Sequence, residues 1–250
     1  MNTGRLWIGL PAYNEAASVA PLFARFLEVF PRKALDYRIV LYNDGCTDGT
    51  VEAARAWEDR LNVEVIGLAE NRGLGQGLRS LVGHAARHGA PQDALFVMDC
   101  DDTHHPRQIP PMAALLDADC DVVIASRYRR GARVAGVAAH RRLLSLGAAV
   151  LFKAIHPVRG VLDYTCGYRG YRVALLRRAL ERYGDNLVRE RGFACMVELL
   201  LKLDRAGARM REVPLDLRYD LKRGASKMDV GGNASRLLGK LVSWRLHGLE

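Results

Sequence analysis

The chain has 250 residues, of which 49% are hydrophobic and 26% are charged. This composition suits a globular protein with one large α/β domain and a sizeable core, and two full domains would hardly fit in this length. The net charge of +9 and the isoelectric point near 9.6 favour anionic partners, such as phosphorylated substrates, nucleic acid or an acidic membrane surface. The five cysteines are odd in number and form no C-x-x-C pair, so neither a disulfide framework nor a zinc site is indicated.

No basic and then apolar leader opens the chain. Its longest mostly apolar stretch, residues 143–152, is about half of the ~20 residues that a membrane-spanning helix needs. We therefore expect a cytoplasmic protein that does not cross a membrane. Peripheral contact with the inner face of the membrane stays open, because basic residues flank this apolar stretch and it could lie on a lipid surface.

Strand and helix patterns alternate along the first half of the chain. Short apolar runs predict strands at residues 5–10, 37–42, 63–67, 94–98 and 122–125. Between them, helices are predicted at residues 19–30, 49–61, 74–88 and 110–116. Strict alternation favours a parallel sheet with right-handed crossovers. Beyond residue 126 the pattern changes to helices at 140–155, 173–183 and 193–206, a strand at 209–215 and a last helical stretch from 230.

Helix starts carry local signals of their own. Ser18 is the expected cap of the first helix, with Pro21 tolerated in its first turn, and Thr47 or Asp48 is the expected cap of the second helix.

Several carboxylates follow the apolar run at residues 94–98, at Asp99, Asp101 and Asp102, with Cys100 between the first two. In open α/β sheets, ligands gather at the carboxyl ends of such strands. Neighbouring carboxylates repel one another unless a cation lies between them, and Mg²⁺ or Mn²⁺ takes carboxylate and phosphate oxygens. The segment therefore predicts a metal and diphosphate site. The alternative is that acidic residues simply end a strand in solvent, so the neighbouring loops must decide.

Polar loops also follow the first two predicted strands. Pro11, Ala12, Tyr13 and Glu15 end the first, and residues 43–50 end the second. Together they predict a crevice for a nucleotide, in which Asp44 accepts from base or ribose and Tyr13 stacks. The glycine-rich residues 71–77, which include Arg72 and Gly73, open a helix whose free amides favour phosphate. The sequence has no G-x-G-x-x-G fingerprint after the first strand, which excludes a nicotinamide-binding Rossmann site. The P-loop pattern is absent too.

An arginine cluster follows the fifth predicted strand. Its members are Arg127, Arg129, Arg130, Arg133, Arg141 and Arg142, joined by Arg223 and Lys227. Such a cluster is what phosphate binding requires, although a solvated basic face would have the same composition.

The chain resembles the family-2 glycosyltransferases of the GT-A fold, and most closely their dolichyl-phosphate mannosyltransferase-like, or polyprenyl-phosphate glycosyltransferase, branch. The resemblance is collinear from about residue 8 to residue 228 and rests on seven segments. These are residues 10–15 (LPAYNE), 43–50 (NDGCTDGT), 71–75 (NRGLG), 98–101 (MDCD) with His105 and Pro106, 126–128 (SRY), 163–169 (DYTCGYR) and 223–227 (RGASK).

The resemblance implies an α/β fold of the GT-A (Rossmann-like) type, with a mostly parallel sheet flanked by helices. Residues 1–228 would form a single glycosyltransferase domain, with a nucleotide-sugar-binding half at 1–126 and an acceptor-side half at 127–228. Residues 229–250 would add a basic amphipathic helix. On that helix, Leu237, Leu238, Leu241 and Trp244 either lie at a lipid interface or pack on the protein's own sheet, and packing is favoured because most such faces are core.

The resemblance also implies a nucleotide-diphosphosugar donor, a mannose or glucose-like sugar transferred with inversion, and Mg²⁺ or Mn²⁺ on Asp99 and Asp101. Catalytic roles fall on Asp101, Arg127 and Arg141. The expected donor-binding residues are Pro11, Ala12, Tyr13, Glu15, Asp44, Arg72, Gly73, Asp99 and Cys100. The expected acceptor-binding residues are Arg127, Arg141, Ser145, Arg223 and Lys227.

Two departures from the branch leave points open. Thr103 stands where the branch often has glutamine, and Asp102 is an additional acid, so the third protein ligand of the metal is not assigned. We do not expect His104 or His105 to be ligands, because Mg²⁺ and Mn²⁺ prefer oxygen in such a setting. The choice between a GDP-sugar and a UDP-sugar also stays open.

The acceptor decides whether a general base is required. A polyprenyl phosphate, the favoured acceptor, is already anionic. A soluble hydroxyl or amine acceptor, such as a secondary metabolite, would need a carboxylate to take its proton. The candidates for that base are Asp102, Asp163, Glu190 and Glu198. A nucleic-acid-binding protein without enzymatic activity is disfavoured, because no helix-turn-helix, ribonucleoprotein motif or zinc spacing occurs.

Overall fold

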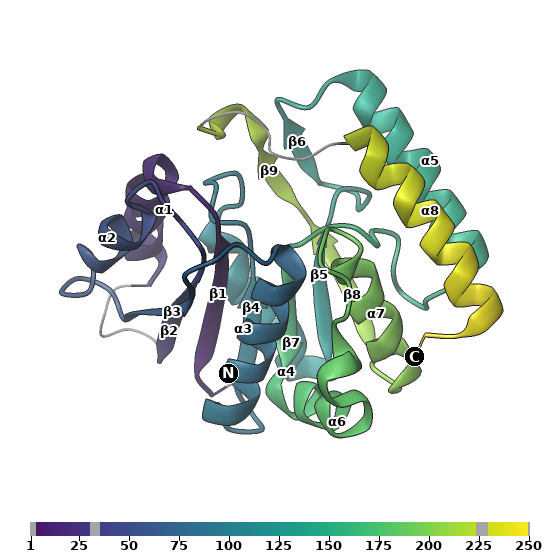
Figure 1. Cartoon of the computed structure of the whole chain (residues 1–250), viewed down its shortest axis with the longest axis horizontal. Coiled ribbons are helices and arrows are strands. Elements are labelled where there is room, and N and C mark those ends of the chain that lie inside the picture. The colour runs from purple at the N-terminus through teal and green to yellow at the C-terminus, as the bar shows by residue number, and fades with distance from the viewer. Residues whose placement is uncertain (1–3, 31–35, 224–229, 250) are drawn as a thin grey trace.

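The computed structural model describes residues 4–30, 36–223 and 230–249. Its centre is a seven-stranded sheet in the order β3-β2-β1-β4-β7-β5-β8, and a separate two-stranded sheet pairs β6 with β9 (Figure 1). The strands of the large sheet are β1 (Leu6–Ala12), β2 (Tyr37–Asp44), β3 (Val63–Leu68), β4 (Ala94–Val97), β5 (Val122–Ser126), β7 (Arg169–Arg172) and β8 (Met210–Pro214). The small sheet consists of β6 (Arg133–Ala135) and β9 (Asp216–Arg218). The predicted α/β class with a mostly parallel sheet is confirmed.

Helices cover both faces of the large sheet. The α-helices are α1 (Ala16–Val29), α2 (Thr50–Arg55), α3 (Leu74–His88), α4 (Ile109–Asp119), α5 (Ala139–Ile155), α6 (Val173–Tyr183), α7 (Cys195–Arg205) and α8 (Val230–His247). Short 3₁₀ turns within the described residues are η1 (Pro106–Gln108), η2 (Gly184–Leu187) and η3 (Tyr219–Leu221). Helices α3, α6 and α7 pack together on one face, and α1 and α4 meet at η1 on the other. Helices α5 and α8 lie side by side at one end of the molecule (Figure 1).

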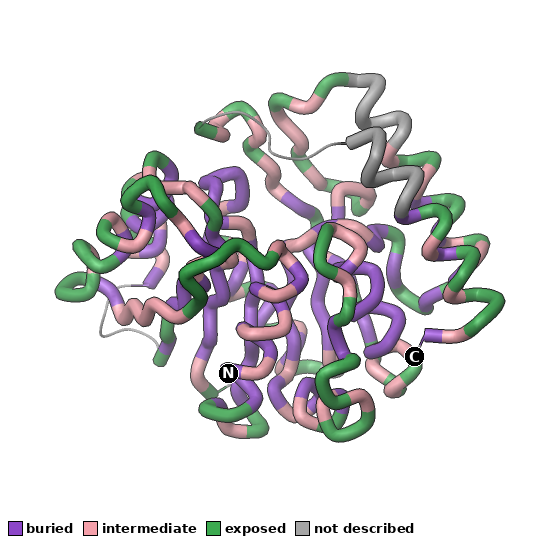
Figure 2. The backbone as a smooth tube through the Cα atoms, in the orientation of Figure 1, coloured by how far each residue is buried: buried purple, intermediate pink, exposed green. Residues whose placement is uncertain are grey.

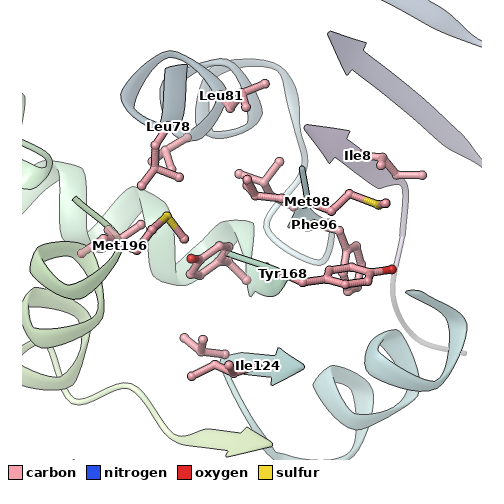
Figure 3. Packing of buried hydrophobic residues seen from close by; sticks show 14 of the residues in the cluster. Ile8, Leu78, Leu81, Phe96, Met98, Ile124, Tyr168 and Met196 are labelled. Atoms are coloured by element: carbon pink, nitrogen blue, oxygen red, sulfur yellow. The ribbon is translucent and has the colours of Figure 1, made fainter. Parts of the chain in front are cut away.

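The central strands are apolar on both sides because both faces of the sheet are covered. Every residue of β4 and β5 is buried, and the core continues from them into the covering helices (Figure 2). Leu78 and Leu81 of α3 and Met196 of α7 form part of this core (Figure 3). Continuous apolar strands of this kind are typical of a parallel sheet.

Strand β7 is the main departure from the expected pattern. It runs antiparallel between β4 and β5, and the sequence pattern predicted no strand at these residues. Gly170 permits this insertion, because a Cβ atom there would come within 2.4 Å of the ring of Phe96 on the neighbouring strand. Since β7 is antiparallel to both of its neighbours, β4 and β5 remain parallel to each other. Their carboxyl ends therefore lie at the same edge.

Two helix predictions were wrong in detail. The first helix begins at Ala16 rather than near residue 19, so Ser18 is inside it and Pro21 lies beyond its first turn. Asp48 satisfies the amides at two helix starts: Oδ2 accepts from Ala16 N at 3.0 Å, and Oδ1 accepts from Thr50 N at 3.1 Å. It thereby fastens α1 to α2.

Helix α2 ends at Arg55, six residues short of the predicted end at 61. Beyond it the chain tightens into turns in which Trp57 N donates to Ala54 O at 3.1 Å. The tighter turn brings Trp57 against Phe23 of α1, with ring centroids 6.1 Å apart. Core packing thus outweighs the helical pattern of this segment.

Candidate functional site

The loops that end β1, β2, β4 and β5 meet at one edge of the sheet. Strand β1 pairs in parallel with β2 and β4, and Met98 N donates to Gly9 O at 3.1 Å just before the acidic residues begin. The predicted crevice loops therefore come together. The predicted donor-binding residues at 11–15, at Asp44 and at 99–101 all lie along this edge.

The acidic segment after β4 presents its carboxylates to very different extents. The side chain of Asp99 is 49% exposed, whereas that of Asp101 is 9% exposed. Asp102 is buried and has a left-handed backbone with φ of 63°. Its Oδ1 lies 3.2 Å from Arg25 Nε, and burial raises the pKa of Asp102 against the opposing effect of Arg25. Asp99 is therefore the carboxylate most open to a ligand.

Asp101 is already surrounded by donors. Its Oδ1 accepts from Thr103 N at 3.2 Å and Thr103 Oγ1 at 2.6 Å, and its Oδ2 accepts from Lys222 Nζ at 2.6 Å. Burial opposes ionisation of Asp101, but the hydrogen bonds of Lys222 and Thr103 outweigh it and lower its pKa. No local pattern pointed to Lys222, because it lies 121 residues away from Asp101 along the chain.

The carboxylates of Asp99 and Asp101, which follow β4, fit a hard divalent cation that takes its remaining ligands from a diphosphate and water. The ammonium of Lys222 shows that Asp101 pairs with a cation here. Within the described ranges, no group of three or more His, Cys, Asp or Glu side chains could hold a metal ion by itself.

The two histidines after the acidic residues accept backbone hydrogen bonds. His104 Nδ1 accepts from Asp99 N at 3.3 Å, and His105 Nδ1 accepts from Arg107 N at 3.2 Å.

The loop after β1 is fastened onto the loop after β2. Asn14, with φ of 54°, accepts from Thr47 N at 2.8 Å, and Cys46 Sγ donates to Ala12 O at 3.4 Å. Tyr13 is 40% exposed beside them. The two predicted nucleotide-binding loops are thus joined by hydrogen bonds, with an aromatic ring exposed beside them.

Asp44 supports the third loop of the crevice. Its two carboxylate oxygens accept from Arg72 N at 2.8 Å and Gly73 N at 2.9 Å. The predicted contact of Asp44 with a base or ribose would use the remaining lone pairs of these oxygens. The carboxylate therefore shapes the turn that leads into α3.

The first turn of α3 is covered by residues 190–191. Gly75 N donates to Arg191 O at 2.8 Å, and a Cβ atom at Gly75 would lie only 1.7 Å from Glu190 O. This amide is therefore occupied, although the sequence predicted a phosphate at the helix start. Beside it is a polar cavity of about 210 Å³, lined by Arg72, Gln76, Arg79, Arg189, Glu190 and Arg191.

Arg127 follows β5 and is held by Asp163. Its Nε donates to Asp163 Oδ2 at 2.8 Å, and its Nη2 donates to Asp163 Oδ1 at 2.6 Å and to Thr165 Oγ1. Burial disfavours the charge on Arg127, but the charge and hydrogen bonds of Asp163 outweigh it and raise the pKa of the guanidinium. This bidentate pair fixes the plane of the guanidinium, and its side chain remains 26% exposed.

A second buried carboxylate supports this pair. Glu212 Oε1 accepts from Leu162 N and Asp163 N, each at 2.7 Å, and Glu212 Oε2 lies 3.4 Å from Arg129 Nε. Asp163 and Glu212 therefore position two members of the predicted arginine cluster. Sequence reasoning missed Glu212, which lies in strand β8.

The other predicted acceptor residues are placed only in part. Ser145 lies in α5, where its carbonyl accepts from Tyr128 Oη at 2.8 Å. This bond ties α5 to the residue after Arg127. Arg141 lies in the first turn of α5, but its side chain is outside the described residues, as is the whole of Lys227. Arg223 is exposed at the end of a described segment.

All four candidate general bases are engaged with partners. Glu198 is 2% exposed and accepts from Arg189 N at 2.8 Å, from Glu190 N at 2.9 Å and from Lys202 Nζ at 2.8 Å. Glu190 pairs with Lys240 of α8. Asp102 and Asp163 are buried against Arg25 and Arg127. Each of these four acids therefore has a cationic partner in the protein.

Comparison with known proteins identifies the family of the chain. Residues 7–180 match the family described as Glycosyl transferase family 2. The polyprenol monophosphomannose synthase of Mycolicibacterium smegmatis is 29% identical over 250 residues, which is 98% of this chain and 89% of that protein. The undecaprenyl-phosphate mannosyltransferase of Micrococcus luteus is 30% identical over 241 residues, 95% of this chain and 92% of that protein.

Solved structures show the same fold. Glucosyl-3-phosphoglycerate synthase from Mycobacterium tuberculosis, crystallised with Mn²⁺, uridine diphosphate and phosphoglyceric acid, superposes with a TM-score of 0.70. The match covers 97% of this chain and 78% of that one at 20% identity. The predicted GT-A fold and the polyprenyl-phosphate branch are thus confirmed. The chain is therefore a glycosyltransferase and belongs to glycosyl transferase family 2.

Proposed function

We propose that this enzyme transfers a mannosyl residue, with inversion, from a nucleoside-diphosphate mannose to a polyprenyl phosphate. One observation carries the proposal: acidic residues end β4 and a pinned arginine follows β5, at the same edge of the sheet. The names of the relatives from M. smegmatis and M. luteus support mannose and a polyprenyl phosphate.

The donor's diphosphate would bind at the acidic tip, the segment after β4 that contains Asp99, Asp101 and Asp102. Asp99 and Asp101 would hold Mg²⁺ or Mn²⁺, which when bound offsets the negative charge that develops on the leaving diphosphate. The loops at 11–15 and 72–73 would enclose the nucleotide. Arg72 brings a further positive charge to that side of the crevice.

Acceptor chemistry favours a phosphate over a hydroxyl. Arg127 presents a planar, permanently charged group that suits bidentate phosphate binding. A phosphate oxygen is already anionic near neutral pH and attacks without a strong base. The four acids that could have served as a base for a hydroxyl acceptor are occupied by cationic or backbone partners.

Helices α5 and α8 offer a surface for peripheral membrane contact. They pack together where His156 Nε2 and Leu241 O lie 3.1 Å apart, with Leu237 and Leu241 buried. These two residues are therefore buried within the protein, as the preference for self-packing predicted, and their helix packs against α5. Other apolar side chains of the pair are exposed, namely Leu146, Val150 and Leu151 of α5 and Leu238, Val242 and Leu246 of α8. No helix within the described ranges has the length and apolarity to span a bilayer.

The transfer assay that tests the proposal uses labelled GDP-mannose and UDP-sugars, each offered with a polyprenyl phosphate or with the matching free polyprenol. We expect mannose on the phosphate acceptor and none on the alcohol, with Mn²⁺ or Mg²⁺ required. Asp101→Asn should reduce turnover at least about 100-fold, since it removes a charge that stabilises the transition state. Thermal shifts with Mn²⁺ and each nucleoside diphosphate would identify the base, because the tighter ligand stabilises more.

Three results would contradict the proposal. Normal turnover of Asp101→Asn would mean that the acidic tip is not the metal site. Glucose transfer in place of mannose transfer would change the sugar but keep the acceptor. Efficient transfer to a soluble alcohol would replace the acceptor, and the base would then have to be sought among acids other than the four engaged ones.

A further inference from the structure

Lys222 is the cation that contacts the carboxylate at the centre of the acidic tip. Its Nζ donates to Asp101 Oδ2 at 2.6 Å, and the two side chains are 18% and 9% exposed. A lysine ammonium and a divalent metal ion use the same carboxylate oxygens. Lys222 therefore stands where a cation bound to Asp101 would have to enter.

The backbone delivers this lysine to the tip. Arg218 N of β9 donates to Thr103 O at 2.9 Å, and His104 forms an antiparallel bridge with Leu217. Lys222 N then donates to Tyr219 O at 3.3 Å in turn η3. Because the segment is anchored to residues 103–104, only the side chain needs to move when the ammonium leaves Asp101.

The three acids that follow β4 have different surroundings. Arg25 of α1 lies 3.2 Å from Asp102, Lys222 covers Asp101, and Asp99 is half-exposed. The two Asp101 oxygens already accept three hydrogen bonds, two from Thr103 and one from Lys222. A metal ion that binds Asp101 must therefore compete with the ammonium, since two cations in contact repel each other.

We propose that Lys222 is a tethered counter-ion that competes with the divalent metal for Asp101 and exchanges that carboxylate for the donor's diphosphate when the metal and the nucleotide bind. The lysine thereby weakens binding of the metal alone. With a diphosphate present, the displaced ammonium gains phosphate oxygens as partners. Metal and nucleotide binding are thus positively coupled. This inference rests on the proposed metal-dependent function and adds the order in which its ligands are favoured.

Mn²⁺ titration followed by electron paramagnetic resonance tests the competition directly. Dissociation constants are measured for Mn²⁺ alone and for Mn²⁺ with saturating GDP or UDP. In Lys222→Met, Mn²⁺ alone should bind about 10-fold or more tightly than in the wild type, because a charge-assisted hydrogen bond no longer opposes it. With nucleotide, this difference should shrink to about threefold or less, because the lysine then also stabilises the bound state.

Two matched variants separate competition from general electrostatics. Arg25→Met also removes a cation from the acidic tip, but one that pairs with Asp102. It should tighten binding of Mn²⁺ alone by less than about threefold, the effect of a charge that does not occupy the ligand oxygen. Lys222→Arg keeps the charge and should stay close to the wild type. Circular dichroism confirms that each variant is folded.

The outcomes distinguish this inference from the proposed function. Equal shifts in Lys222→Met and Arg25→Met, or no shift in Lys222→Met, overturn the role of Lys222 and leave the metal site standing. If Asp101→Asn binds Mn²⁺ as tightly as the wild type, the metal site is elsewhere and both proposals fall.

Discussion

Single buried carboxylates decide what the arginines of this site can do. Asp163 is fully buried, and it accepts from the Arg127 backbone amide at 3.0 Å as well as from its guanidinium. The sequence could predict Arg127 from its motif and from its position after a strand. It could not predict that Asp163, a candidate base, would hold Arg127 instead, because the two lie 36 residues apart. The same holds for Lys222 and Asp101, whose contact depends on the path of β9.

Replacing Asp163 by asparagine should expose this dependence. Removing one partner of a buried ion pair leaves the other charge uncompensated, so Asp163→Asn should lower the free energy of unfolding by about 3–5 kcal/mol. Urea unfolding near neutral pH measures this loss. Asp36→Asn is the control, because Asp36 pairs with Arg5 at an exposed site where the side chains are 62% and 39% exposed. It should cost no more than about 1 kcal/mol.

The pH dependence of that loss follows from the pKa of Asp163. Burial alone would raise it, but the charge and hydrogen bonds of Arg127 lower it below the ordinary value. A carboxyl group with a depressed folded-state pKa stabilises the fold above its unfolded pKa, about 3.9, and loses that contribution as the pH falls through the folded value. The gap between wild type and Asp163→Asn should therefore narrow below about pH 4. A gap that is constant from pH 7 to pH 3 would contradict this assignment.

Elements that bury both faces are the ones the sequence predicted well. The runs at β1, β4 and β5 are apolar almost throughout, which identifies them as strands without knowledge of their neighbours. Strand β7 has only four residues, two of them arginine, and it is a strand because β4 and β5 supply hydrogen bonds on both sides. In helix α2 the sequence predicted more helix than forms, because the residues after Arg55 adopt turns in which Trp57 packs against Phe23. Tertiary packing, which no local pattern contains, decided both.

Helix α3 allows a sharp test of the contact that covers its first turn. Gly75→Ala places a Cβ atom 1.7 Å from Glu190 O, so residues 190–191 must move away from the helix. We expect a loss of stability of about 1–3 kcal/mol, typical of overpacking, together with weaker binding of a nucleoside diphosphate. Differential scanning fluorimetry with and without nucleotide measures both effects.

Gly83→Ala, in the same helix, is the matched control. A Cβ atom at this position meets nothing closer than 3.5 Å, where the flexible end of Arg87 lies. Alanine has the higher helix propensity, so this variant should gain up to about 1 kcal/mol and leave nucleotide binding unchanged. Equal behaviour of the two variants would show that the 190–191 contact does not shape the crevice.

At the scale of the whole molecule, a basic chain carries exposed apolar residues at the end formed by α5 and α8. The chain has a net charge of +9, and helices α5 and α8, which lie side by side (Figure 1), carry exposed apolar residues. Tyr128 links α5 to the residue that follows β5, so this apolar surface is mechanically connected to Arg127. An acceptor with a long hydrocarbon tail and a phosphate head would use both: the apolar surface for its tail and Arg127 for its head.

Binding to vesicles tests whether this surface contacts lipid. The wild type should sediment with vesicles of acidic phospholipid at low salt and less at high salt, because screening weakens the attraction of a basic protein. Val150→Glu and Leu246→Glu, at positions that are 64% and 72% exposed, should each weaken binding about fivefold or more, since a carboxylate is repelled by the acidic surface.

Leu68→Glu, at a 37% exposed position on β3, is the control and should bind as the wild type does. Exposed substitutions of this kind change stability by about 0.5 kcal/mol or less, so a selective loss in the α5 and α8 variants reports on the surface itself. If all three variants and the wild type bind alike, the contact is a general effect of net charge and the apolar end plays no part in it.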